Sequence, residues 1–125
     1  MKGIAFYFFA LGVLSVLIGM GWGLQMAISG DHLLAPAHAH LNLLGWVTFS
    51  IFAFYYHLVP GAAEGTLPKL HLAVAVIGLA LMIPGIAIAV SAGGEPLAAI
   101  GSLLSALSML IFAVIVVKNG QRGTA

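Results

Sequence analysis

Four long stretches almost free of charge constrain the fold of this chain more than any other feature. They cover residues 3–29, 36–59, 70–91 and 96–117. Each is long enough for a transmembrane helix, which needs about 20 apolar residues. Only 6% of the 125 residues are charged, too few to cover the surface of a water-soluble domain of this size. The sequence therefore predicts one all-α domain, residues 1–125, with four transmembrane helices.

Turn-forming residues separate the four segments, in the stretches "SGDHLLAP", "PGAAEGTLPK" and "SAGGEP". Pro36 and Pro96 fall in the first turn of a predicted helix, where the missing N–H removes no hydrogen bond. Within the first segment, Gly19 and Gly23 are four residues apart, a spacing that favours close contact between membrane helices. We therefore expect this face of the first helix to pack tightly against a neighbour.

The distribution of basic residues predicts the orientation in the membrane. With four spans, the lysine and arginine residues all share one side: Lys2, Lys69, Lys118 and Arg122. The two loops on the other side carry Asp31 and Glu95 and neither lysine nor arginine. The positive-inside rule then places both termini in the cytoplasm. We expect an integral protein of the inner (cytoplasmic) membrane of a prokaryote.

Composition excludes most familiar chemistries. The chain has no cysteine, which rules out disulfides, thiolate metal sites, iron–sulfur clusters and cysteine nucleophiles. Its net charge of +1 comes without a basic patch, so nucleic acid is not an expected partner. The three carboxylates lie in loops on both sides of the membrane, and so do not form a paired-carboxylate site. No catalytic residue is predicted, and any metal chemistry rests mainly on the five histidines.

His38 and His40 stand out in the stretch "APAHAHLNLLGW", residues 35–46. A helix turns about 100° per residue, so these two side chains point about 200° apart and cannot share one metal ion. Imidazoles at membrane depth are costly and usually functional. Hydration near the interface and a zinc or copper surface site are alternative interpretations. Haem agrees best with the pattern, because neutral imidazole is a standard axial ligand.

The neighbours of this pair agree with haem binding. Ala37, Ala39 and Gly45 would leave room for a porphyrin. Asn42 follows His38 by four residues, so its amide could hydrogen-bond the ligand imidazole. It could equally form a polar contact between helices. The predicted cofactor-binding residues are therefore His38, His40, Asn42 and Gly45.

The other three histidines carry less information. His57 ends the second segment after two tyrosines, and His71 opens the third. The favoured interpretation places both at the membrane interface beside an aromatic belt. The alternative is a second metal site, or a proton-entry group together with Glu64. His32 lies in a loop and is expected to be solvated.

The stretch "HAHLNLLGWVTFSIFAFYYHLVP", residues 38–60, resembles the second-helix region of subunit I of the haem–copper oxidase superfamily, including its nitric-oxide-reductase branches. In that family the subunit has twelve helices in three arcs of four. One helix carries a His-x-His pair whose imidazoles ligate two different haems. His38 and His40 match that pair in spacing, helix number and membrane side. The resemblance implies b-type haem on these two residues and electron transfer in the membrane.

The chain also departs from the family pattern. The adjacent His-His pair that binds copper is missing, and so is the histidine followed four residues later by tyrosine. Tyr55 and Tyr56 precede His57 instead. The resemblance therefore implies haem binding without oxygen or nitric oxide reduction, and it gives no support for bound copper.

The three arcs of the family imply a homotrimer, in which one short chain supplies each arc. Each copy would offer His38 to one neighbour and His40 to the other, so that a bis-histidine haem lies at every boundary. Such a head-to-tail contact must close into a ring. A twofold dimer is the alternative.

The expected partners are membrane lipid, further copies of the chain and a quinol or redox protein. A non-redox structural or assembly subunit of a respiratory complex, or a haem or copper carrier to an oxidase, are the alternative functions.

Overall fold

The computed structural model describes residues 1–120, and Arg122 lies outside this range. Its elements are α1 (Gly3–Ser29), α2 (Ala35–His40), the π-helix η1 (Leu41–Thr48), α3 (Phe49–Leu58), the short 3-10 helix η2 (Pro60–Ala63), α4 (Leu67–Ala92) and α5 (Pro96–Gly120). The elements α2, η1 and α3 continue one another as a single span, Ala35–Leu58. All four spans are long and apolar enough to cross a membrane. The prediction of an all-α fold with four such helices is confirmed for the described residues.

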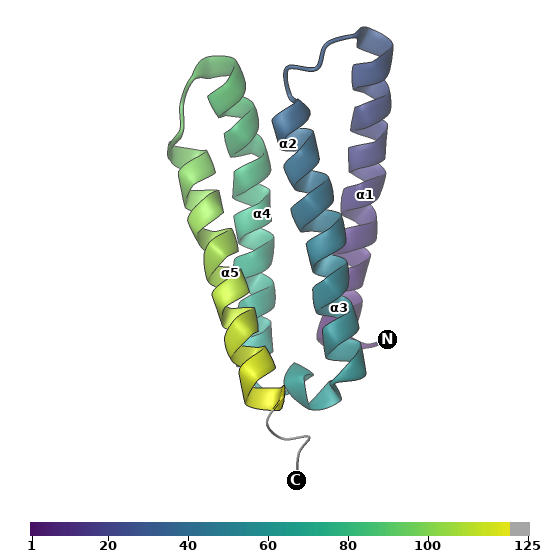
Figure 1. Ribbon diagram of the computed structural model, residues 1–125, viewed down its shortest axis with the longest axis vertical. Coiled ribbons are helices and arrows are strands. Elements are labelled where there is room, and N and C mark those ends of the chain that lie inside the picture. The colour runs from purple at the N-terminus through teal and green to yellow at the C-terminus, as the bar shows by residue number, and fades with distance from the viewer. Residues whose placement is uncertain (121–125) are drawn as a thin grey trace.

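The four spans lie side by side as two helical hairpins (Figure 1). The helix α1 packs along α3 and η1, and α5 packs along α4, which also contacts α2. The N-terminus and the end of α5 lie at the same end of the bundle (Figure 1). This end carries Lys2, Lys69 and Lys118, at or near helix ends, and is called the lysine end below. Asp31 and Glu95 lie in the two connections at the opposite end.

Glycine and proline residues explain why the helices end where the sequence predicts. The helices α1 and α4 stop at Gly30 and Gly93, which adopt positive φ angles of 71° and 81°. The amide of each glycine donates to the carbonyl four residues earlier, at 3.0 and 3.1 Å, as in the left-handed helix cap. Pro36 lies in the first turn of α2, and Pro96 begins α5. Local backbone chemistry therefore sets the boundaries of these spans.

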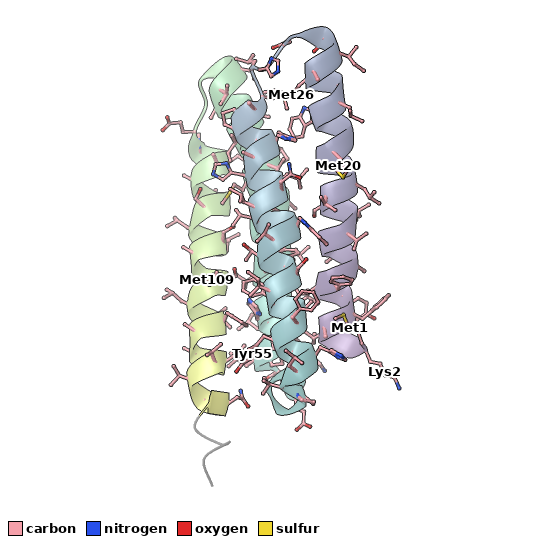
Figure 2. All side chains as sticks on the ribbon, turned by 45° about the vertical axis from the view of Figure 1, so that its right-hand side comes forward. Met1, Lys2, Met20, Met26, Tyr55 and Met109 are labelled. Atoms are coloured by element: carbon pink, nitrogen blue, oxygen red, sulfur yellow. The ribbon has the colours of Figure 1, made fainter. Side chains whose placement is uncertain are left out.

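The best-packed part of the core lies in the half of the bundle nearer the lysine end. The ring of Phe8 on α1 lies 5.2 Å from that of Phe49 and 5.3 Å from that of Phe52, measured between centroids. Tyr56 and Ile115 belong to the same buried cluster. Many large apolar side chains elsewhere remain exposed, which suits a surface that faces lipid. The side chains that radiate from the bundle are seen in Figure 2.

A π-helix in the second span was not predicted from the sequence. The hydroxyl of Thr48 donates to the carbonyl of Leu43, five residues earlier, at 2.9 Å. The π segment follows His40 directly and contains Asn42 and Gly45. Because π segments inside α-helices occur frequently at functional sites, this irregularity draws attention to the same stretch as the histidine pair.

Candidate functional site

His38 is half-buried and points toward α1. A Cβ built on Gly23 would lie 3.1 Å from the His38 Cε1 atom. The indole ring of Trp22 lies 6.2 Å from the imidazole, edge to face. Gly23 therefore makes the room that the imidazole occupies, and the close helix contact predicted for Gly19 and Gly23 is confirmed.

Asn42 holds His38 within the same interface between α1 and the second span. The amide nitrogen of Asn42 lies 3.2 Å from His38 Nε2. When the amide donates to Nε2, the imidazole proton sits on Nδ1, which is buried without a hydrogen-bond partner in residues 1–120. The Asn42 side chain also fills the space beside Gly19, where a Cβ would overlap it. Asn42 is thus a hydrogen-bond partner of His38 on the same span, while its Oδ1 atom has no hydrogen-bond partner within residues 1–120 and makes no polar contact to α1.

His40 is exposed, and only one of its ring nitrogens has a hydrogen-bond partner within residues 1–120. Its Nδ1 atom lies 2.7 Å from the carbonyl oxygen of Pro36. A carbonyl can only accept, so Nδ1 carries the proton and Nε2 keeps its lone pair. A hydrogen bond from Nδ1–H to a backbone carbonyl is the usual way in which a protein orients a metal-binding imidazole. His40 therefore presents an oriented imidazole whose Nε2 atom could serve as a metal ligand.

The predicted haem-site residues His38 and Gly45 do not lie on the same exposed face of the bundle as His40. The two imidazoles lie on different sides of the helix, as their spacing predicts. His38 does not suit a haem iron in this conformation, because Asn42 occupies its Nε2 atom. Gly45 is buried, and a Cβ there would lie 2.6 Å from the Ser15 Cβ and 3.2 Å from Leu79 Cδ2. Within one chain, Gly45 makes room for neighbouring helices and not for a porphyrin.

His32 and His57 are both exposed. His32 Nδ1 lies 3.1 Å from the carbonyl oxygen of Gly30 in the connection after α1, in agreement with a solvated loop residue. His57 lies near the end of α3 and lines a cavity of about 370 Å³ together with Lys2. Figure 2 shows Lys2 extending from the lysine end of α1.

The expectation of an interfacial His71 was wrong, because its side chain is 0% exposed. Its Nδ1 atom lies 2.8 Å from the hydroxyl oxygen of Tyr56. The rings of Phe8, Phe52 and Phe112 surround it, with centroids 5.0, 4.5 and 5.5 Å away. The imidazole is therefore enclosed by aromatic side chains from three helices and not hydrated at the membrane surface.

A spacing pattern in α4 could have identified this burial. The buried face of α4 includes His71, Ala75, Gly78, Met82 and Gly85, at intervals of three and four residues. Three of these residues are small, and small residues at such intervals mark the packing face of a membrane helix. His71 lies on that packing face. The position of His71 along the helix indicates its depth in the membrane but not which face of the helix is buried.

Within residues 1–120, no three histidine, aspartate or glutamate side chains lie close enough together to hold a metal ion. His57 and His71, considered above for a second metal site, therefore do not belong to such a group of three. Comparison of the chain with protein-family models, with curated proteins and with solved structures gives no match.

Proposed function

We propose that this chain binds b-type haem in the membrane, with His40 as an axial ligand, and that electrons pass through this haem. The observation that carries the proposal is the exposed His40 imidazole, whose Nδ1–H donates to the Pro36 carbonyl and whose Nε2 has no hydrogen-bond partner within residues 1–120. A polar side chain on a lipid-facing surface is costly unless something covers it. A porphyrin would cover it, and the haem would supply the redox chemistry.

The proposed orientation places the lysine end in the cytoplasm. Lys2, Lys69 and Lys118 lie at this end, while Asp31 lies in the connection at the other. The positive-inside rule then makes both termini cytoplasmic, in the inner membrane of a prokaryote. His40, in the first turns of the second span, lies in the outer half of the bilayer. Electrons would reach the haem from a quinol or a redox protein at that side.

A second copy of the chain supplies the other axial ligand in this proposal. A twofold pair needs only His40 from each copy, and both residues are already exposed with Nε2 free. The three-membered ring implied by the family resemblance needs His38 to leave Asn42 and turn outward. The geometry therefore favours a twofold pair with one haem between two chains, and the trimer is the alternative.

A structural or assembly subunit is the second candidate function. It is favoured by the packing of His38, which bonds Asn42 and fills the space beside Gly23. A small residue such as Gly23 lets membrane helices pack closely, and the His38 side chain fills the space that it leaves. On this interpretation His40 is a hydrated residue near the interface.

The test is purification of the full chain in mild detergent after expression with ample haem, followed by absorption spectroscopy and native mass spectrometry. A twofold haem protein gives the narrow reduced α-band of low-spin bis-imidazole haem and a mass of two chains with one haem. A mass of three chains with three haems would support the three-membered ring instead of the twofold pair. A colourless protein would contradict haem binding and favour the structural subunit.

A further inference from the structure

A hydrogen-bonded tyrosine–histidine pair lies enclosed in the core near the lysine end. Tyr56 is 2% exposed and His71 is 0% exposed. Tyr56 belongs to α3 and His71 to α4, so their hydrogen bond joins two transmembrane spans. Apolar side chains could fill the same space in this part of the core without any buried polar atom. The presence of two titratable groups here therefore points to a role beyond packing.

The hydrogen bond indicates where the protons reside. If Tyr56 donates to Nδ1 of His71, the imidazole proton sits on Nε2. That nitrogen has no hydrogen-bond partner in the part of the chain that the structure describes. The reverse arrangement would leave both the Tyr56 hydroxyl proton and the Nε2 lone pair unused within the pair. The first arrangement is therefore preferred. The Nε2–H group can then donate only weak hydrogen bonds, to the faces of the surrounding aromatic rings.

Tyr56 connects the pair to the surface of the bundle. Its side chain lines the cavity of about 370 Å³ at the lysine end, together with Lys2, His57 and Pro60. Lys2 and His57 are exposed, so water reaches this cavity. One partner of the buried pair thus lies on a wetted wall while the other lies behind it.

A second, smaller cavity lies about one helical turn deeper in the bundle than His71, which is not among its lining residues. It measures about 20 Å³ and is lined by Phe52, Ala75, Ser105 and Ser108, among other residues. Ala75 follows His71 by one helical turn. A volume of this size is about what one water molecule needs, and the serine hydroxyls provide polar neighbours. Space for water therefore exists beside Tyr56 and about one helical turn deeper than His71.

We infer that Tyr56 and His71 form a proton-exchange site between the water at the lysine end and the interior of the bundle. A hydronium ion in the larger cavity gives a proton to the Tyr56 hydroxyl oxygen and becomes water, while the original hydroxyl proton moves to Nδ1 of His71. Tyr56 stays a neutral phenol, and His71 becomes an imidazolium. The Nε2 proton then passes to a water molecule in the smaller cavity, which becomes hydronium, and His71 is left neutral with its proton on Nδ1. The net result is the transfer of one proton without any electron.

The surroundings favour passage of the proton over its retention. The rings that enclose His71 come from Phe8 on α1, Phe52 on α3 and Phe112 on α5, and none of them is charged. The charged or titratable side chains on the cavity wall beyond Tyr56 are those of Lys2 and His57, and the amino group of Met1 belongs to the same wall, with no carboxylate among the described lining residues. An imidazolium without a counter-charge in a low-dielectric site is costly, so a proton that reaches His71 is soon released. This inference concerns the end of the bundle opposite His40 and does not depend on haem.

The test is the exchange rate of the His71 Nε2 proton with D₂O, measured by NMR on the full chain with ¹⁵N-histidine in lipid nanodiscs. The Tyr56→Phe variant removes the relay hydroxyl and keeps the ring. The matched control is Tyr55→Phe, the same change at the half-buried neighbour. A relay through Tyr56 predicts that Tyr56→Phe slows the exchange by about 100-fold, the low end of what a positioned proton-transfer group contributes. Tyr55→Phe should leave the rate close to that of the wild type.

The sign of the effect separates a relay from a closed structural pair. If the proton exchanges only when the core opens, losing the Tyr56 hydrogen bond makes opening easier and exchange faster. Faster or unchanged exchange in Tyr56→Phe would therefore overturn the proposal. The ¹⁵N shifts of His71 also report the tautomer, and a wild-type protein with its proton on Nδ1 would contradict the assigned donor.

Discussion

The side-chain amide of Asn42 occupies the space that a Cβ on Gly19 would need. Asn42 in turn contacts His38 Nε2, so the packing of α1 and the position of the imidazole are linked. Gly19 therefore does more than allow two helices to approach closely, because it leaves the space in which Asn42 contacts His38.

We predict that Gly19→Ala destabilises the bundle by about 1–3 kcal/mol, the usual cost of overpacking. The added methyl group must displace Asn42 and with it His38. Gly21→Ala is the matched control, because nothing lies within 4 Å of a Cβ at Gly21 on the same helix. Thermal unfolding in detergent provides the measurement. Equal midpoints for the two variants would show that Asn42 moves aside without cost.

Gly85→Ala should be more damaging than Gly19→Ala. A Cβ at Gly85 would lie 2.7 Å from the Cα of Ala98 on α5, and a backbone atom cannot move aside as a side chain can. The α4–α5 hairpin must therefore separate to accept the methyl group. The control is Gly94→Ala, where the nearest atom is 3.7 Å away. Thermal unfolding under the same conditions should rank Gly85→Ala lowest, and a midpoint above that of Gly19→Ala would refute this reading of the hairpin.

Replacing Phe8 by alanine tests the aromatic core. Phe8 is 0% exposed, whereas Phe6 on the same helix is 53% exposed. We expect Phe8→Ala to cost about 3 kcal/mol, the low end for a buried phenylalanine. The low end applies because packing contacts, and not transfer from water, provide the stability of helices in lipid. Phe6→Ala should change stability little in a denaturant titration of the reconstituted protein, and a comparable loss in both variants would place the core elsewhere.

The proposed orientation can be tested directly because the chain has no cysteine of its own. Single cysteines at Asp31 and Glu95 should react with a membrane-impermeant maleimide added to intact cells. A cysteine at Glu64 should react only after the cells are permeabilised, because residue 64 lies in the connection at the lysine end. Labelling of the Glu64 variant in intact cells, with protection of the other two, would reverse the orientation.

The limits of the helices could be predicted from the sequence because their causes are local. Pro36 and Pro96 mark helix starts, and Gly30 and Gly93 mark helix ends whatever the rest of the fold does. The π segment from Leu41 to Thr48 has no comparable local signature in this sequence. It was missed because every residue in it is compatible with an ordinary helix inside a long apolar span.

The inward-facing side chains were harder to predict. In a soluble helix, alternating apolar and polar faces show which side is buried, but a membrane helix is apolar on all sides. His71 lies one turn from the start of α4, and this depth suggested a position at the membrane interface. The side chain is buried because it lies on the face of α4 that packs against the other helices. For His38 and His40 the angular separation could be predicted, but the contact of His38 with Asn42 and Gly23 depends on where α1 packs.

Haem ligation by His40 is tested most directly by the reduced absorption spectrum of His40→Ala, purified beside the wild type, His32→Ala and His38→Ala. His32 is the matched control, because its Nδ1 also contacts a backbone carbonyl, that of Gly30, but it lies outside the spans. We expect His40→Ala to lose the low-spin haem band. His32→Ala should keep it fully, and His38→Ala should keep it if the haem lies between two His40 residues. A low-spin band of wild-type size in His40→Ala would contradict the proposed ligand.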